Sequence, residues 1–204
     1  MMEVDRLVVG PLGVNCYLLW NPEGRGALVV DPGDDGAGIV AECRRRELVV
    51  RGVLLTHAHV DHIRGVGAVA AAFGCPVRLS PADLPLYRSP ANALPPWLAA
   101  AVDLPAPGTV PADLPGLAFE ILETPGHTPG GGCYFFPEAG VVFTGDTLFA
   151  GAIGRADLPG GDHGALLRSI RDRLLPLPDA TRVLPGHGAE STIGAERRQN
   201  PYLR

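Results

Sequence analysis

Short apolar runs, rich in β-branched residues, alternate along the chain with turns of Gly, Pro and Asn. This alternation predicts strands. The predicted strands cover residues 4–10, 14–20, 26–31, 49–56, 117–123, 132–136, 140–145 and 181–186. Helices are predicted from their cap and stop residues, which are Asp34 or Asp35 for 35–48, Gly74 for 65–74 and Asp162 for 162–175. Strands punctuated by surface helices favour a layered α/β fold.

Residues 81–115 interrupt this pattern. They hold nine of the 21 prolines and leave room for one helical turn near residues 96–102. The same stretch also carries Leu, Trp and Tyr, so we expect a long ordered loop or lid rather than disorder. With 204 residues, 46% of them hydrophobic, the chain suits one compact domain over residues 1–204.

Composition narrows the classes of function. The net charge of −5 provides no basic surface for nucleic acid. All 17 basic residues are arginine, which excludes a Schiff-base lysine and the lysine of a P-loop. No apolar run approaches the ~18 residues of a membrane span, and the N-terminus lacks a signal-peptide layout. Four separate cysteines in apolar surroundings predict reduced thiols. We therefore expect a cytoplasmic protein with a small-molecule partner, and the sequence carries no signal for its oligomeric state.

Side chains that bind metals follow four of the predicted strands. The four places are "GVLLTHAHVDH", "FEILETPGHTPG", "GVVFTGDTLF" and "TRVLPGHG". Side chains at the ends of neighbouring strands gather at one rim of a sheet, where loops allow them to converge. The candidates, which include five of the six histidines, are His57, His59, Asp61, His62, His127, Asp146 and His187.

Imidazole and carboxylate ligands without a thiolate suit zinc or a similar divalent ion. Seven ligands are too many for one tetrahedral ion. Two ions with one bridging carboxylate and open positions for water are therefore expected, which is typical of a catalytic rather than a structural site. Zinc is the expected metal, and iron or manganese also fit such ligands.

The motifs "THAHVDH", "PGHTPG", "TGDTLF" and "LPGHG", in this order, resemble those of the metallo-β-lactamase-fold hydrolases over most of the chain. The wider text "GDTLFAGAIGRADLPGGDH" and "PGHGAESTIGAERRQNPYL" is similar to the short hydroxyacylglutathione hydrolases of the glyoxalase II type. The resemblance implies a four-layer αββα sandwich with the metals at one edge.

The resemblance also implies a role for each candidate. His57, His59 and His127 would hold one metal, Asp61, His62 and His187 the other, and Asp146 would bridge the two. Asp31, in "VVDPG", matches the first motif of the family and would support the ligands from behind. Full-length glyoxalase II enzymes add a helical C-terminal domain that contacts glutathione. Only residues 188–204 follow His187, too few for that domain, so the identity of the thiol half of the substrate is left open.

The expected reaction is hydrolysis of a thioester, such as S-lactoylglutathione or a similar acyl-thiol, by attack of a metal-bridging hydroxide. Two divalent ions, two carboxylates and one hydroxide leave a charge of about +1, which favours an anionic intermediate. Asp61 would orient the nucleophile and take its proton. A thiol with a pKa of about 8.5 can leave as thiolate without a dedicated acid.

Other interpretations of the same motifs stay open. A persulfide dioxygenase-like enzyme with a single iron shares the H-x-H-x-D-H text, and lactonase or β-lactamase activity is a less favoured alternative. A non-catalytic metal-binding module is the alternative from another class. Arg155 and Asp157 form either a loop-fixing ion pair or, through Arg155, a substrate contact. His163 is expected to pack on the first turn of a helix, and Asn15 to end a strand or turn.

Overall fold

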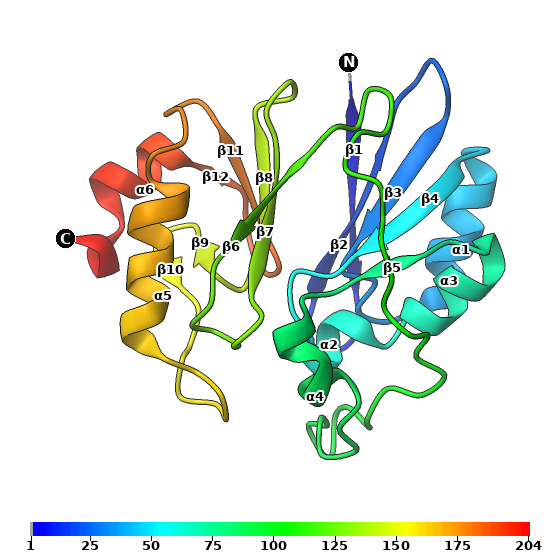
Figure 1. Cartoon of the computed structure of the whole chain (residues 1–204), viewed down its shortest axis with the longest axis horizontal. Coiled ribbons are helices and arrows are strands. Elements are labelled where there is room, and N and C mark those ends of the chain that lie inside the picture. The colour runs from blue at the N-terminus through cyan, green and yellow to red at the C-terminus, as the bar shows by residue number, and fades with distance from the viewer. Residues whose placement is uncertain (1) are drawn as a thin grey trace.

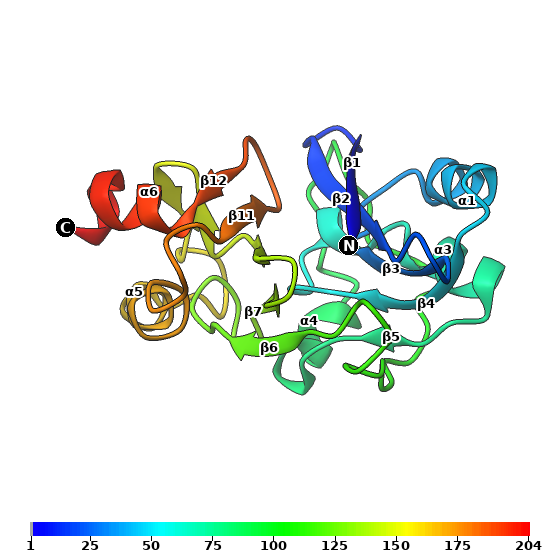
Figure 2. The same cartoon turned by 90° about the horizontal axis from the view of Figure 1, so that it is seen from above.

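Two five-stranded β-sheets lie face to face between two layers of helices in the computed structural model, which describes residues 2–204 (Figures 1 and 2). The first sheet has the order β1 (Glu3–Val9), β2 (Val14–Trp20), β3 (Gly26–Val30), β4 (Val49–Leu54) and β5 (Val77–Arg78). The second has the order β12 (Ser191–Thr192), β11 (Arg182–Pro185), β8 (Val141–Gly145), β7 (Gly132–Phe136) and β6 (Glu120–Glu123). A small hairpin, β9 (Leu148–Phe149) and β10 (Ala152–Ile153), stands apart.

Helices cover the outer face of each sheet (Figure 1). The helices are α1 (Gly36–Arg45), α2 (Val60–Ile63), α3 (Val66–Phe73), α4 (Leu84–Tyr87), α5 (His163–Ser169) and α6 (Ile193–Gln199). Short helical turns are η1 (Pro81–Asp83), η2 (Ile170–Leu174) and η3 (Pro201–Leu203). In Figure 1, α1 and α3 flank the first sheet and α5 and α6 flank the second, so the layers run α, β, β, α.

Buried apolar side chains form three separate clusters, because successive side chains of a strand point to opposite faces of its sheet. Leu18 and Val29 point toward α1 and α3, whereas their neighbours Leu19 and Leu28 point between the two sheets. A third cluster lies under α5 and η2. Each fully buried leucine contributes about 1.5–3 kcal/mol relative to an exposed one. Because every sheet face is covered, the predicted four-layer αββα sandwich is confirmed.

The direction of the strands brings the carboxyl ends that precede the predicted ligands to one edge of the sandwich. β3 and β4 run parallel, as do β8 and β11, and parallel neighbours bring their carboxyl ends to the same edge. A bridge between Val14 and His187 joins the two sheets there. The loops after these strands therefore meet across the seam between the sheets.

Most of the predicted elements are present, with two kinds of difference. The caps at Asp35 and Asp162 are confirmed, since their side chains accept hydrogen bonds from the amides of Gly38 and Ala165. The helical turn predicted near residues 96–102 is wrong: the helical turns of the proline-rich segment lie at 81–87 instead. A short helix is marginal in water and needs a buried face, and from 96 to 102 only Leu98 is buried. α2 and α6 were not predicted.

The cysteines and the helices bear on two expectations from composition. All four cysteines are free thiols. Within residues 2–204, none of the helices combines the length and the apolar character needed to cross a membrane.

Candidate metal centre

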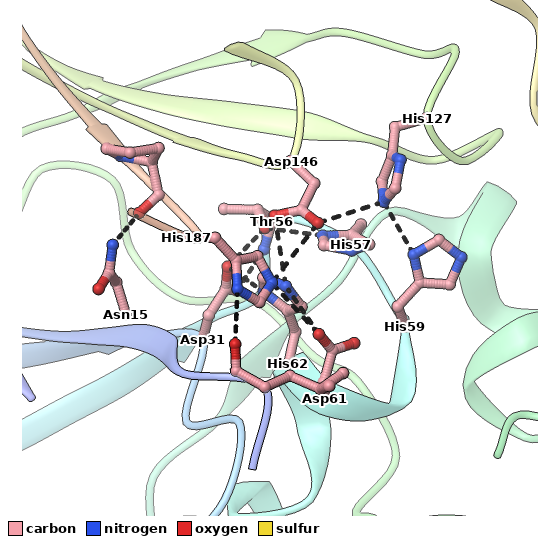
Figure 3. A network of polar contacts seen from close by, with 12 residues as sticks. Asn15, Asp31, Thr56, His57, His59, Asp61, His62, His127, Asp146 and His187 are labelled. Atoms are coloured by element: carbon pink, nitrogen blue, oxygen red, sulfur yellow. Dashed lines mark hydrogen bonds and ion pairs between the residues drawn. The ribbon is translucent and has the colours of Figure 1, made fainter. Parts of the chain in front are cut away.

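The seven predicted ligands converge at the edge where the strand ends meet (Figure 3). The β4–α2 loop carries His57 and His59, and α2 itself carries Asp61 and His62. The second sheet supplies His127 from the β6–β7 loop, Asp146 from the end of β8 and His187 from the end of β11. Two groups match the predicted division, with donor atoms within 4.8 Å of one another: His57, His59 and His127 in one, and Asp61, His62 and His187 in the other. A third group at the same spacing joins Asp31 to His57 and His62.

Asp31 sets the direction of one histidine in each group. Its carboxylate accepts hydrogen bonds from the Thr56 amide (2.8 Å), the Thr56 hydroxyl (2.6 Å) and Nδ1 of His62 (3.0 Å). Because the hydroxyl donates its single hydrogen to Asp31, it can only accept from Nδ1 of His57, 3.0 Å away. Both imidazoles therefore carry their proton on Nδ1 and present Nε2. Asp31 thus contacts Thr56 and His62, and its supporting role stays a prediction.

Main-chain carbonyls orient two further histidines. Nδ1 of His127 donates to the carbonyl of Arg155 at 2.7 Å, and Nδ1 of His187 donates to that of Leu12 at 3.2 Å. Each ring is left with Nε2 free to bind a metal. His59 instead presents Nδ1, which lies 2.9 Å from Nε2 of His127. Partners of this kind fix the tautomer and the orientation of metal-binding histidines.

Asp146 faces both groups. Its Oδ1 lies 3.4 Å from Nε2 of His62, and its Oδ2 lies 3.6 Å from Nε2 of His127 and 3.7 Å from Nε2 of His187. Oδ2 therefore lies near one member of each group, so this carboxylate can contact both.

The residues fit divalent metal ions. Nε2 of His57, Nε2 of His62 and Oδ1 of Asp146 are buried without any hydrogen-bond partner. Buried polar atoms without partners are costly, and metal ions bound by the two groups would supply the missing partners. Gly186 keeps this space open, because a Cβ there would overlap Asp146 and His62.

Two rings of the first group, His57 and His59, suit metal binding, which needs neutral imidazoles. Burial, followed by the charge of His62, holds the pKa of His57 well below its ordinary value. Burial and His127 lower the pKa of His59 to about 4. Burial opposes ionisation of Asp146, yet the neighbouring His62 outweighs it and lowers the pKa of that carboxyl. The site thus combines two neutral rings, His57 and His59, with a carboxylate that stays charged.

The Metallo-beta-lactamase superfamily pattern matches residues 9–187. The chain belongs to the metallo-beta-lactamase superfamily. The predicted superfamily is thereby confirmed. Among the relatives of this superfamily member is the hydroxyacylglutathione hydrolase GloC of Haemophilus influenzae, with 36% identity over 210 residues that cover 99% of this chain and 98% of GloC.

Solved structures of the superfamily give the same fold. BLEG-1 B3 metallo-beta-lactamase is 37% identical with a TM-score of 0.90, over 98% of this chain and 99% of that one. The di-iron-bound form of TTHA1623 is 40% identical with a TM-score of 0.88, over 98% and 100%. ETHE1 from Myxococcus xanthus is 28% identical with a TM-score of 0.76, over 98% and 83%.

A cavity of about 300 Å³ opens over the metal centre. The predicted ligands His59, Asp61, His127 and Asp146 form its polar floor. Its apolar walls come from the β1–β2 turn, the proline-rich segment and the loop after β10, and consist of Leu12, Leu86, Ala91, Ala93, Leu94, Leu158 and Pro159. Four other hollows, of about 310 to 520 Å³, are lined by none of the predicted ligands. The segment 81–115 is ordered and forms one wall of the site.

The structure gives the positions of Arg155 and His163, for which the sequence left more than one role open. The guanidinium of Arg155 makes two hydrogen bonds of 2.7 Å to Asp157, so the ion-pair alternative is present. Arg155 also borders the cavity, and its contact with substrate stays a prediction. His163 lies exposed at the first position of α5 and belongs to neither ligand group.

Three residues that support the ligands were not singled out by the motifs. Asn15, on β2, donates to the carbonyls of Pro185 (2.9 Å) and Gly188 (3.0 Å) on either side of His187. Asp83 and Asn92, in the proline-rich segment, bond to the main chain beside the other histidines. Their partners are main-chain atoms distant in sequence, so no spacing rule could have found them.

Proposed function

We propose that this protein is a binuclear metal-dependent hydrolase of thioesters, such as S-lactoylglutathione or a similar acyl-thiol. The observation that carries the proposal is the position of Asp146, whose carboxylate faces both ligand groups beneath one open cavity. The 36% identity to GloC, over nearly the whole of both chains, supports the short glyoxalase II type. The seven residues would serve as ligands in the grouping that the resemblance implied.

Zinc is the proposed metal, and iron or manganese suit the same imidazole and carboxylate ligands. When bound, two such ions supply a hydroxide nucleophile at neutral pH and polarise the carbonyl of the substrate.

Asp61 is the proposed proton acceptor. It lies on the floor of the cavity, and its Oδ2 is 3.3 Å from Nε2 of His187. That contact holds one oxygen in place, while the exposed part of the side chain can orient the attacking water and take its proton. Proton removal at this position would turn the water into a nucleophile that can attack the acyl carbon of a substrate in the cavity.

The cavity walls bind and orient the rest of the substrate. Leu86 and Leu94 on one side and Leu158 on the other can hold the acyl and thiol chains and displace water from the floor. Binding of these remote parts positions the reacting carbonyl. We propose Arg155 as the contact for a carboxylate on the thiol moiety, because its planar fork can form two hydrogen bonds to a carboxylate. Since a thiol has a pKa of about 8.5, it departs without a general acid.

Metal analysis combined with a thioester assay tests the proposal. We expect close to two ions per chain and hydrolysis of S-lactoylglutathione that is lost on chelation and restored by metal. A protein that holds both ions but hydrolyses no thioester would favour the non-catalytic module.

A second function is favoured by one observation, the 28% identity to ETHE1 over 98% of this chain. A persulfide dioxygenase-like enzyme would hold a single iron and consume oxygen in the presence of a persulfide. Retention of one iron after reconstitution with excess metal, together with oxygen uptake, would overturn the binuclear hydrolase. A β-lactam should be included as a third substrate because of the 37% identity to BLEG-1.

A further inference from the structure

Asp83 is a fully buried carboxylate at the start of the proline-rich segment. A buried charge is costly unless several donors surround it, and three do so here. They are the Thr128 hydroxyl at 2.8 Å, the Gly130 amide at 2.6 Å and the Ala58 amide at 3.0 Å. One side chain thus holds the main chain at two separate places.

Both places lie beside ligands of the same group. Ala58 stands between His57 and His59 on the loop from the first sheet, whereas Thr128 and Gly130 follow His127 on a loop from the second. Asp83 therefore ties together the two loops that carry the three imidazoles of the first group. The approach is so close that a Cβ on Gly130 would lie 2.7 Å from Asp83 Oδ1.

Asn92 holds the same loop from the other side. Its Nδ2 donates to the carbonyl of Ala58 at 2.7 Å and to that of Leu86 at 3.2 Å. The amide and the carbonyl of Ala58 are thus both held by the proline-rich segment. This carbonyl belongs to the peptide bond between Ala58 and His59, so the contact fixes the position of the His59 main chain, from which the imidazole extends.

The second ligand group depends on other partners. His62 is oriented by Asp31, and the loop of His187 is held by Asn15. Loss of Asp83 therefore removes support from one group and leaves the contacts of the other in place.

We propose that Asp83, assisted by Asn92, is a positioning residue that holds His57, His59 and His127 at the geometry of one metal ion. The proposal builds on the metal centre of the proposed function, and assigns to the proline-rich segment a role in metal affinity besides that of cavity wall. Partners of metal ligands typically contribute about 10- to 100-fold in affinity.

The variant Asp83→Asn tests the proposal with little change in shape. Its amide keeps one acceptor oxygen but turns an N–H group toward at least one of the three donors. Stepwise binding of zinc to the metal-free full chain, measured by competition with a chromogenic chelator, should show one ion weakened about 10- to 100-fold. Anomalous diffraction at limiting zinc should show lower occupancy beside His57, and wild-type occupancy beside His187.

Glu196→Gln is the matched control. Glu196 is also a buried carboxylate that joins separate segments, accepting from the Gly151 amide (2.9 Å), from Asn200 Nδ2 (2.8 Å) and from the Ser191 hydroxyl. This control should lower the melting temperature and leave both zinc affinities unchanged. Equal weakening of zinc in the two variants would reduce Asp83 to a general stabiliser and overturn the proposal, as would wild-type zinc affinities in Asp83→Asn.

Asn92→Ala provides a second variant, and decides the matter if Asp83→Asn does not fold. It should weaken the same ion by a smaller factor, because Asp83 still holds both loops when the contact of Asn92 with the Ala58 carbonyl is lost. Unchanged affinity there would overturn the proposal. These outcomes are independent of the substrate, so a failure of the thioester assay concerns the proposed function alone.

Discussion

Replacement of Thr56 by valine should weaken one of the two metal ions and spare the other. The Thr56 hydroxyl donates to Asp31 and accepts from Nδ1 of His57, and both side chains are buried. Valine has a similar shape but accepts no hydrogen bond. In the metal-bound state His57 must keep its proton on Nδ1 so that Nε2 can bind, and this N–H then has no partner.

The size of the effect follows from a comparison of the two states. A buried donor without a partner costs about 1–3 kcal/mol. In the metal-free variant the ring can move its proton to Nε2, which faces the polar interior of the site, so the cost falls on the metal-bound state. At 1.4 kcal/mol per tenfold change, the dissociation constant of that ion should rise by about 5- to 150-fold. His62 keeps its own bond to Asp31, so the other ion should bind as in the wild type.

The assay is stepwise zinc binding, with the melting temperature measured in parallel at several zinc concentrations. Thr56→Ser keeps the hydroxyl and should restore the affinity. Thr144→Val removes a buried hydroxyl that donates to the carbonyl of Leu148 at 2.8 Å, and should lower stability without a change in zinc affinity. Wild-type affinity for both ions in Thr56→Val would refute the assigned tautomer of His57.

Three further predictions concern the bridge, the substrate and the surface. Asp146→Ala should weaken both ions in a metal titration, whereas His62→Ala should chiefly weaken one; full metal content and activity in the first variant would contradict the bridge. Arg155→Ala should lower kcat/KM for anionic thioesters more than for neutral ones at unchanged metal content, and equal losses would leave the residue with the ion pair only. Hydrogen bonds from Arg45 and its neighbour lower the pKa of Glu42 from 4.5 to about 2. A depressed carboxyl pKa stabilises the fold above the unfolded value, so the stability loss in Glu42→Gln should be present at pH 7 and fade between pH 4.5 and about 2 in thermal melts; a pH-independent loss would contradict it.

The strands and helix caps could be predicted because their causes are local. Leu18 and Leu19 point to opposite faces whatever surrounds them, since the side-chain direction alternates along a strand. Asp35 and Asp162 lie next to the amides that they cap. The failure near residues 96–102 has the opposite cause, because burial of Leu98 alone cannot sustain a helix there. α6 did carry a local signal, since the Thr192 side chain caps the amide of Ala195.

The site also has features that the sequence predicts and features that it does not. The seven proposed ligands follow strand ends in recurring motifs, so their convergence could be anticipated from the sequence. The hydrogen bonds that orient these side chains could not be anticipated in this way. Arg155 supplies its carbonyl to His127 as well as its guanidinium to Asp157, and a carbonyl has no sequence signature.

The sequence by itself determined the superfamily, the layered fold and the candidate ligands, because periodicity, caps and ordered motifs are written in neighbouring residues. Only the tertiary structure decided how those ligands are oriented. Thr56 bonds to Asp31, Asn15 to Pro185, and Asp83 to Gly130, and each of these pairs joins segments far apart in the chain. A hydrogen bond depends on distance and angle in space, and the backbone atoms that take part are the same in every residue. The orientation of the metal centre therefore appears only when the two sheets are packed together.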